Sequence, residues 1–206
     1  MPEIRHAATV VLLRDGDSGL ETLMLRRDPA ARFLGGYHVF PGGAVGADDG
    51  DPIAAAVRET FEECGLLLAV DASGAKPSTA TWTSILTDRP ALHAGVASFG
   101  TLLARHGLSI DRDALVYFDR WLTPPDRPRR FDTRFYMARA PHDQQARHDG
   151  VECDDARWLR PAHALAEASL GELLVANATS ATLRRLATHP TVDNALAAAR
   201  AADPPS

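Results

Sequence analysis

The 206-residue chain contains little lysine, little cysteine and no long apolar segment. Lys76 is the only lysine, so arginine carries the rest of the chain's fixed positive charge. Two cysteines, Cys64 and Cys153, are too few for a disulfide framework and lack the Cys-x-x-Cys spacing of a metal site. No apolar stretch approaches the roughly 18 residues of a transmembrane helix, and the N-terminus lacks the apolar run of a secretion signal. These absences predict a cytoplasmic protein with no membrane partner.

The overall composition is that of an ordinary globular protein. Hydrophobic residues make up 45% of the chain and charged residues 24%, which excludes wholesale disorder. Lysine and arginine number 22 against 27 aspartates and glutamates, and the net charge of −5 argues against a nucleic-acid partner. The length suits a single domain over residues 1–206 that carries one insertion.

Hydrophobic periodicity and turn signals predict a mixed α/β order. Strands are expected at 6–13, 21–26, 114–122, 131–139 and 156–160, the first two as a hairpin. Helices are expected at 52–64, 92–106, 161–169, 179–188 and 191–202. Residues 27–50 form a long glycine-containing loop, and such loops in compact domains are often functional. The insertion spans about 71–113, turn-rich at first and then helical, with Val96 and Phe99 on one side of its helix. The C-terminal helices cover about 161–202.

The expected helix at 52–64 has two chemically different sides. Asp51 suits the N-cap position, and Gly65 suits the residue after the end. At 100° per residue, one face collects the residues Ile53, Ala56, Val57, Thr60, Phe61 and Cys64. The opposite arc carries Glu59, Glu62 and Glu63, with Arg58 at its edge. We therefore expect one buried face and three carboxylates presented on the other side.

This carboxylate arc is electrostatically unfavourable. Each like-charged i,i+3 or i,i+4 pair costs roughly 0.2–0.5 kcal/mol, and the helix dipole disfavours anions in the last turns. A solvated acidic face is one interpretation. Only Arg58 compensates the charge nearby, so we favour a bound divalent cation, and oxygen-only ligands favour Mg²⁺ or Mn²⁺ over zinc.

The same helix carries a motif that resembles the second half of the Nudix hydrolase box: Arg58-Glu59-Thr60-Phe61-Glu62-Glu63-Cys64-Gly65-Leu66. The resemblance implies a Nudix-type α/β/α sandwich with a mixed sheet and a helical insertion. It also implies that Glu59, Glu62 and Glu63 bind Mg²⁺ or Mn²⁺, that Glu59 and Glu62 are catalytic, and that Arg58 orients a glutamate. The first half of the box departs from the pattern. Gly43 lies one residue too far from Arg58, and the expected glutamate is replaced by Asp48, Asp49 or Asp51.

The preceding loop carries a second resemblance, to the extra signature of coenzyme A diphosphatases. Its Arg27 and Arg32 are followed by glycine and then by the sequence Phe-Pro-Gly-Gly at 40–43. Glycines such as Gly42 and Gly43 let the backbone approach a phosphate, and arginines supply planar donors for it. A tight turn with surface arginines is the alternative interpretation.

Residues 121–136 resemble the peroxisomal coenzyme A diphosphatase branch and its bacterial relatives. Arg130 and Arg134 in this segment either meet substrate phosphates or pair with acids. The C-terminus lacks a Ser-Lys-Leu-type peroxisomal signal, which keeps the cytoplasm as the expected location. Nudix enzymes also draw a further carboxylate from a later loop, and Glu152 is our candidate.

Together these resemblances imply an Mg²⁺-dependent diphosphatase that acts on coenzyme A or acyl-coenzyme A. The expected products are 3′,5′-ADP and a 4′-phosphopantetheine product. The expected partner is a small nucleotide-type molecule, and a homodimer is left open. One alternative is another nucleoside-diphosphate-linked substrate, such as ADP-ribose, a dinucleotide or an oxidised nucleotide. The other is a catalytically silent Nudix-fold binding module.

Overall fold

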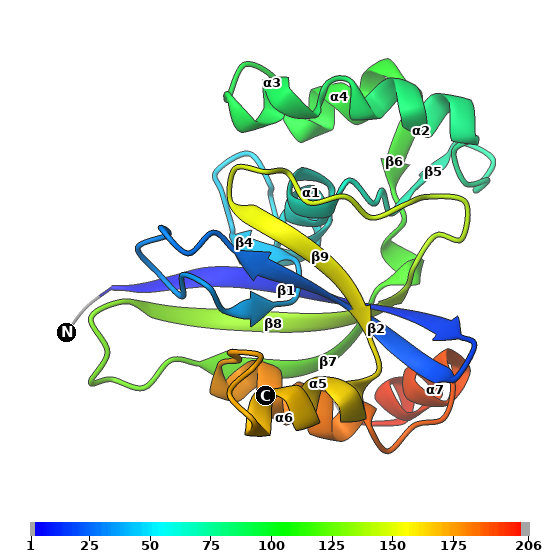
Figure 1. The fold of residues 1–206 in the computed structure, drawn as a ribbon. Helices are drawn as coiled ribbons and strands as arrows, with labels where there is room; N and C mark the ends of the chain where they lie inside the picture. Colours follow the sequence, from blue (N-terminus) through cyan, green and yellow to red (C-terminus); the bar gives the residue numbers. More distant parts are fainter. Residues whose placement is uncertain (1–2, 203–206) are drawn as a thin grey trace.

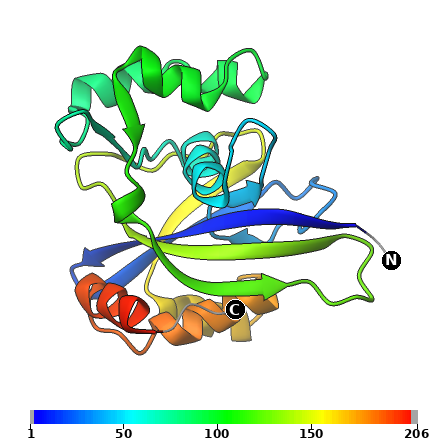
Figure 2. The same cartoon turned by 180° about the vertical axis from the view of Figure 1, so that it is seen from behind.

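The computed structural model describes residues 3–202, and its centre is a mixed β-sheet between two helical layers. The strands of this sheet are β1 (Ile4–Gly16), β2 (Gly19–Arg27), β3 (His38–Val39), β4 (Gly42–Ala44), β7 (Val116–Leu122), β8 (Arg130–Arg139) and β9 (Cys153–Leu159). Helix α1 (Pro52–Cys64) covers one face of the sheet. The other face is covered by α5 (Pro161–Ser169), α6 (Asn177–Leu186) and α7 (Val192–Ala201), as Figures 1 and 2 show. The predicted α/β/α sandwich with a mixed sheet is confirmed.

The long strand β1 organises the sheet. The strands of the sheet follow the order β3-β2-β1-β8-β7. In addition, β4 pairs with β1, and β9 pairs with β2. β1 and β8 run parallel along their length, whereas the other pairs are antiparallel. The predicted hairpin is present, with Gly16 opposite Gly19 at its turn. Because β4 pairs with the first half of β1, it lies directly beneath α1, which packs on both strands.

Two hydrophobic cores lie on the two faces of the sheet. Ala8, Val10 and Leu12 point toward α1, and the alternating Val11 and Leu13 point toward α5–α7. A strand buried on both sides reads as a continuous apolar run, as this segment of β1 does. None of the helices within residues 3–202 is long and apolar enough to cross a membrane.

The insertion forms a further layer over α1. It contains β5 (Ala69–Asp71), α2 (Thr79–Leu86), α3 (Arg89–His93), α4 (Phe99–Arg105), β6 (Leu108–Ile110) and the 3₁₀ turn η1 (Arg112–Ala114). The antiparallel pair of β5 and β6 closes it at its base. In both ribbon views its helices lie across α1 from the sheet.

The insertion corrects two predictions. The turn-rich assignment of residues 71–90 missed α2, whose N-cap Ser78 accepts a hydrogen bond from the backbone N–H of Thr81 at 3.1 Å. The single helix at 92–106 is wrong as well, because Gly95, with a φ of 65°, separates α3 from α4. Val96 falls in this break and is 81% exposed instead of packing beside Phe99.

Trp82 of α2 ties the insertion to the end of α1. Its indole Nε1 donates a 2.8 Å hydrogen bond to the carbonyl oxygen of Gly65, and the residue is 7% exposed within the core on the α1 side. Gly65 has the left-handed φ of 74° that ends α1, and its N–H donates to the carbonyl of Phe61. The carbonyl of the residue that ends the helix is therefore satisfied by the insertion.

We expect Trp82→Ala to lower the free energy of unfolding by about 3–5 kcal/mol, because it removes a buried aromatic ring from a packed core. Trp82→Phe keeps much of the apolar contact and removes the hydrogen bond, which costs about 1–3 kcal/mol for the unpaired carbonyl. Val96→Ala is the surface control and is expected to change stability by less than about 0.5 kcal/mol. Urea denaturation measures all three, and a Trp82→Ala cost no larger than that of the control contradicts the assignment.

Candidate active site

Three aspartates precede α1, and the structure gives two of them distinct contacts. Asp51 caps the helix, since its Oδ1 accepts the backbone N–H of Ala54 at 2.9 Å. Its Oδ2 lies 2.7 Å from the guanidinium of Arg112 in η1. Asp49 instead binds Arg58 through two hydrogen bonds, Nε to Oδ1 at 2.7 Å and Nη2 to Oδ2 at 2.9 Å. Of these aspartates, Asp49 is therefore the one that contacts Arg58.

Arg58 connects this aspartate to two of the glutamates. Its Nη1 lies 3.0 Å from Glu59 Oε1 and 2.8 Å from Glu62 Oε2. Burial lowers the pKa of Arg58, but the hydrogen bonds that it donates to Asp49 and the charges of Glu59 and Glu62 outweigh this effect and raise the pKa above its usual value. The guanidinium is thus a permanent cation that fixes both glutamate side chains.

Glu63 is buried, which corrects the expectation of three presented carboxylates. Its side chain is 2% exposed, compared with 15% for Glu59 and for Glu62. The Glu63 Oε2 accepts the backbone N–H of Gly42 at 2.9 Å, because β4 folds over this side of the helix. Periodicity placed the residue on the right arc, but it could not show that a strand covers that arc.

Glu59 lies directly over the second glycine of the loop motif. A Cβ atom on Gly43 would overlap the Glu59 carboxylate, so the absence of a side chain there makes room for the acid. Burial is the main cause that raises the pKa of Glu59 to about 7, and the nearby Glu62 adds to it against the opposing charge of Arg58. Burial followed by repulsion from Glu59 also raises the pKa of Glu63 well above its ordinary value. The carboxylates thus carry more negative charge than their surroundings stabilise.

Arg27 and Glu152 complete the cluster from outside α1. Arg27 Nη1 lies 3.8 Å from Glu63 Oε1, and its Nη2 lies 3.5 Å from Glu152 Oε2. Glu152 is half-exposed, at 51%, so it borders the buried glutamates from the solvent side. The neighbouring Asp154 is paired with Arg26 at 2.7 and 2.9 Å instead.

The other predicted arginines are not all brought to the glutamates. Arg32 is exposed, and within residues 3–202 no hydrogen bond or ion pair engages its side chain. Arg134 pairs with Ala8 of β1, which pairs on its other edge with Gly43, so Arg134 lies in the same row of the sheet as the site. Arg130 lies four residues further along β8, roughly 13 Å away at the usual strand rise. It is buried, donates to the carbonyl of Thr123 and lines a separate cavity of about 360 Å³.

Further residues that the sequence patterns did not predict support this cluster. Asp149, whose side chain is 1% exposed, accepts the backbone N–H groups of Val151, Glu152 and Cys153 and so shapes the loop that carries Glu152. Arg89 Nε and His93 Nε2 of α3 lie 2.8 and 2.9 Å from the carbonyl oxygen of Glu62. The Asp149-Gly150 pair is a turn signal that could have marked this loop. No local pattern links Arg89 or His93 to a helix so far away in the chain.

The donor chemistry of Glu59, Glu62 and Glu63 fits a hard divalent cation such as Mg²⁺ or Mn²⁺. All the donors are carboxylate oxygens, and burial raises the pKa of Glu59 and Glu63 despite the arginines beside them. Among residues 3–202, no three histidine, cysteine, aspartate or glutamate side chains are already gathered around a metal position. The three glutamates are not gathered because Glu59 and Glu62 contact Arg58, whereas Glu63 accepts a hydrogen bond from the backbone of Gly42.

A mixed sheet crossed by a helix with this Arg-Glu and Glu-Glu pattern defines the Nudix class. A family model described as the NUDT19 Nudix domain matches residues 52–186, and one described as the NUDIX domain matches residues 4–91. The chain therefore belongs to the Nudix family.

Relatives of known sequence or structure agree with this assignment. The chain is similar to putative nudix hydrolase 7 of Caenorhabditis elegans, at 30% identity over 82% of this chain and 55% of the relative. It is 28% identical to acyl-coenzyme A diphosphatase NUDT19 of Gallus gallus over 80% of this chain and 64% of that protein. The chain thus spans between half and two thirds of the length of these two relatives. A crystal structure of a NUDIX hydrolase from Alicyclobacillus acidocaldarius superimposes with a TM-score of 0.78 at 33% identity, covering 96% of this chain and 97% of that one.

We expect Glu63→Gln to stabilise the metal-free protein. A buried carboxyl with a raised pKa costs stability as the pH rises above its ordinary value of 4.5, because ionisation then favours the unfolded chain. At pH 8 in a chelator the variant should melt at least about 2 °C higher, which corresponds to roughly 1 kcal/mol in a domain of this size. The gap should close at pH 4, where both states hold a neutral carboxyl. A variant that melts lower at both pH values shows that the carboxylate stabilises the fold.

Proposed function

We propose that this chain is an Mg²⁺- or Mn²⁺-dependent diphosphatase that cleaves coenzyme A or acyl-coenzyme A into 3′,5′-ADP and a 4′-phosphopantetheine product. The observation that carries the proposal is the placement of Arg27, from the coenzyme A diphosphatase-like loop, against the buried carboxylate cluster of α1. The similarity to a protein named acyl-coenzyme A diphosphatase supports the same substrate class. A cytoplasmic location and a homodimer stay predictions from the sequence.

In this proposal Glu59, Glu62 and Glu63 hold the cation. A bound divalent cation would neutralise charge on the diphosphate and lower the pKa of a water molecule. Arg58, itself fixed by Asp49, keeps Glu59 and Glu62 in position. Arg27 is our candidate donor for a diphosphate oxygen, because its contacts with Glu63 and Glu152 are longer than those of Arg58 with Glu59 and Glu62.

The proton of the attacking water has two candidate acceptors. Glu152 is half-exposed at the border of the cluster, where water reaches it. Glu59 is the other candidate, because it lies within the carboxylate cluster itself, 3.0 Å from the guanidinium of Arg58. A silent binding module would not need several buried, mutually repelling carboxylates, so the cluster favours catalysis.

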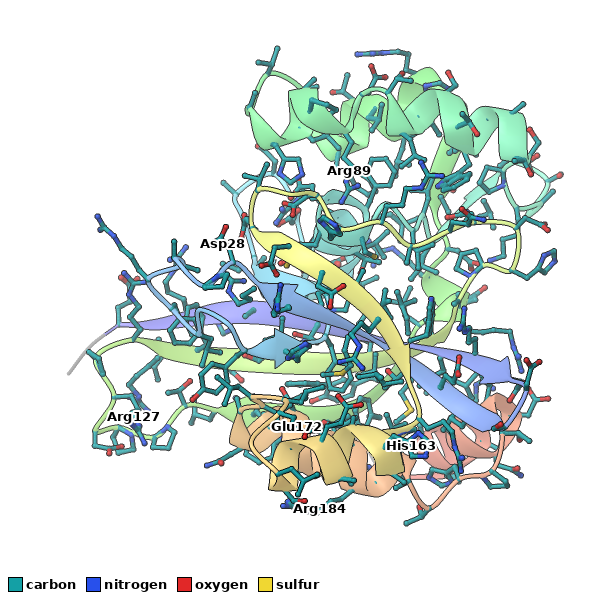
Figure 3. All side chains as sticks on the ribbon, viewed as in Figure 1. Asp28, Arg89, Arg127, His163, Glu172 and Arg184 are labelled. Atoms are coloured by element: carbon teal, nitrogen blue, oxygen red, sulfur yellow. The ribbon has the colours of Figure 1, made fainter. Side chains whose placement is uncertain are left out.

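We expect Glu63→Gln to lower turnover of coenzyme A at least about a hundredfold at saturating Mg²⁺, the low end for loss of an electrostatic or acid–base group. Glu172→Gln is the matched control, because Glu172 is exposed on the α5–α6 side, away from Arg89 and Asp28 (Figure 3). Products are identified by mass over a panel of coenzyme A, ADP-ribose, NADH and dinucleoside polyphosphates. Wild-type turnover in Glu63→Gln removes this residue from the mechanism.

We expect Arg32→Ala to show whether this arginine contacts the 3′-phosphate or the diphosphate of coenzyme A. A charge-assisted contact contributes about 1.5–3 kcal/mol, or one to two powers of ten in kcat/KM. Since Arg32 has an unengaged guanidinium on the substrate loop, its loss should reduce turnover of coenzyme A much more than turnover of 3′-dephospho-coenzyme A. Arg184→Ala, an exposed arginine of α6 labelled in Figure 3, serves as the charge-matched control.

Equal losses on the two substrates would place Arg32 on the diphosphate or in the scaffold of the loop. A wild-type protein that does not prefer coenzyme A to ADP-ribose overturns the substrate assignment and favours another nucleoside-diphosphate-linked substrate. Neither result alters membership of the Nudix family.

A further inference from the structure

A cleft of about 470 Å³ separates α1 from the insertion. On one side it is lined by Ala54, Arg58 and Glu62, which recur at four-residue intervals and therefore share one stripe of α1. On the other side it is lined by residues of the insertion, among them Ala97, Phe99, Gly100, Leu103 and Ile110. Figure 1 shows the helices of the insertion on the side of α1 that faces away from the sheet. The cleft therefore starts at the carboxylate cluster and ends on apolar side chains.

The charges of the cleft do not suit an anionic ligand. Its arginines are both engaged, Arg58 by Asp49 and Glu62 and Arg112 by Asp51. Asp48, Asp49 and Glu62 also contribute carboxylates to the lining. A phosphate entering here would meet no unpaired cation and would be repelled by these acids.

The loop side of the cluster has the opposite character. Arg27 is paired with Glu63 and Glu152 at the longer distances of 3.8 and 3.5 Å, and Arg32 on the same loop is exposed and unpaired within residues 3–202. The loop side thus offers Arg27, which is held by long contacts, and the unpaired Arg32, whereas the cleft offers closely paired charges and apolar side chains. A diphosphate ester with one phosphate-rich end and one uncharged end matches this polarity in one orientation only.

We propose that the cleft between α1 and the insertion receives the uncharged arm of the substrate, the amide-bearing pantetheine chain with its acyl group. The inference rests on the proposed function and adds the orientation of the substrate and the role of the insertion. The volume of the cleft, about 470 Å³, lies in the usual range of about 300–1,000 Å³ for small-molecule pockets. The apolar side chains of the insertion supply the contacts that distinguish this arm from a ribose.

Gly100 offers a way to fill the cleft without touching the carboxylates. It lines the cleft, and a Cβ atom added to it meets nothing within 4 Å. Leucine is also a better helix former than glycine at this position of α4, so the fold is retained. Ala104→Leu is the matched control, because Ala104 is exposed on the same helix and does not line the cleft.

We expect Gly100→Leu to raise KM for coenzyme A about tenfold or more, the usual scale for one surplus apolar group in a fitted pocket. The effect should grow with acyl-chain length, while kcat changes less than about twofold. KM for ADP-ribose, which has no such arm, should stay unchanged, and so should all parameters of Ala104→Leu. Melting temperatures of both variants verify that the fold is intact.

The outcomes separate this inference from the proposed function. If the wild type cleaves coenzyme A and Gly100→Leu leaves its KM unchanged, the arm lies elsewhere and only the inference fails. Equal rises in KM for coenzyme A and ADP-ribose also overturn it, since they indicate a general disturbance of the site. A wild type that cleaves neither coenzyme A nor its acyl esters overturns both.

Discussion

The ion pair between Arg58 and Asp49 is the contact on which the rest of the site depends. Glu59, Glu62 and Glu63 lie in the last two turns of α1, where mutual repulsion, the helix dipole and burial all disfavour negative charge. Arg58 offsets part of this cost by contacting Glu59 and Glu62 at 3.0 and 2.8 Å. Its Nε and Nη2 also donate two hydrogen bonds to the carboxylate of Asp49, which hold the guanidinium in this position.

The negative charge that Arg58 does not offset is the feature of the site that bears on its chemistry. Arg58 does not contact Glu63, and Arg27 approaches it only to 3.8 Å, so burial keeps the pKa of Glu63 raised. A fold that needed only stability would replace a buried acid of this kind with an apolar residue, since buried charge is costly. In the proposed function a divalent cation would supply the missing positive charge, which connects the unfavourable energetics of the helix to the proposed chemistry.

The insertion supports the site from the side opposite to the sheet. Arg89 and His93 reach the carbonyl oxygen of Glu62, and Trp82 reaches that of Gly65. Basic groups near the C-terminal end of a helix interact favourably with its dipole and satisfy carbonyls that lack helical partners. The insertion thus stabilises the end of α1 that carries the glutamates, and its α4 side forms the far wall of the adjoining cleft.

Local patterns in the sequence determined α1, its bounds and the identity of its acidic residues, because capping and helical periodicity depend only on neighbours within a few positions. They also determined the hairpin, β8 and the motif that places the chain in the Nudix family. They did not reveal that β4 buries Glu63, that Gly95 divides the expected helix of the insertion, or that Asp149 and His93 support the site. Residues as distant as Arg27 and Glu152 meet only because β2 and β9 pair in one sheet. Tertiary structure decided that pairing and also the distance of Arg130 from the site along β8. The reason is that the register between distant strands depends on packing that no short segment encodes.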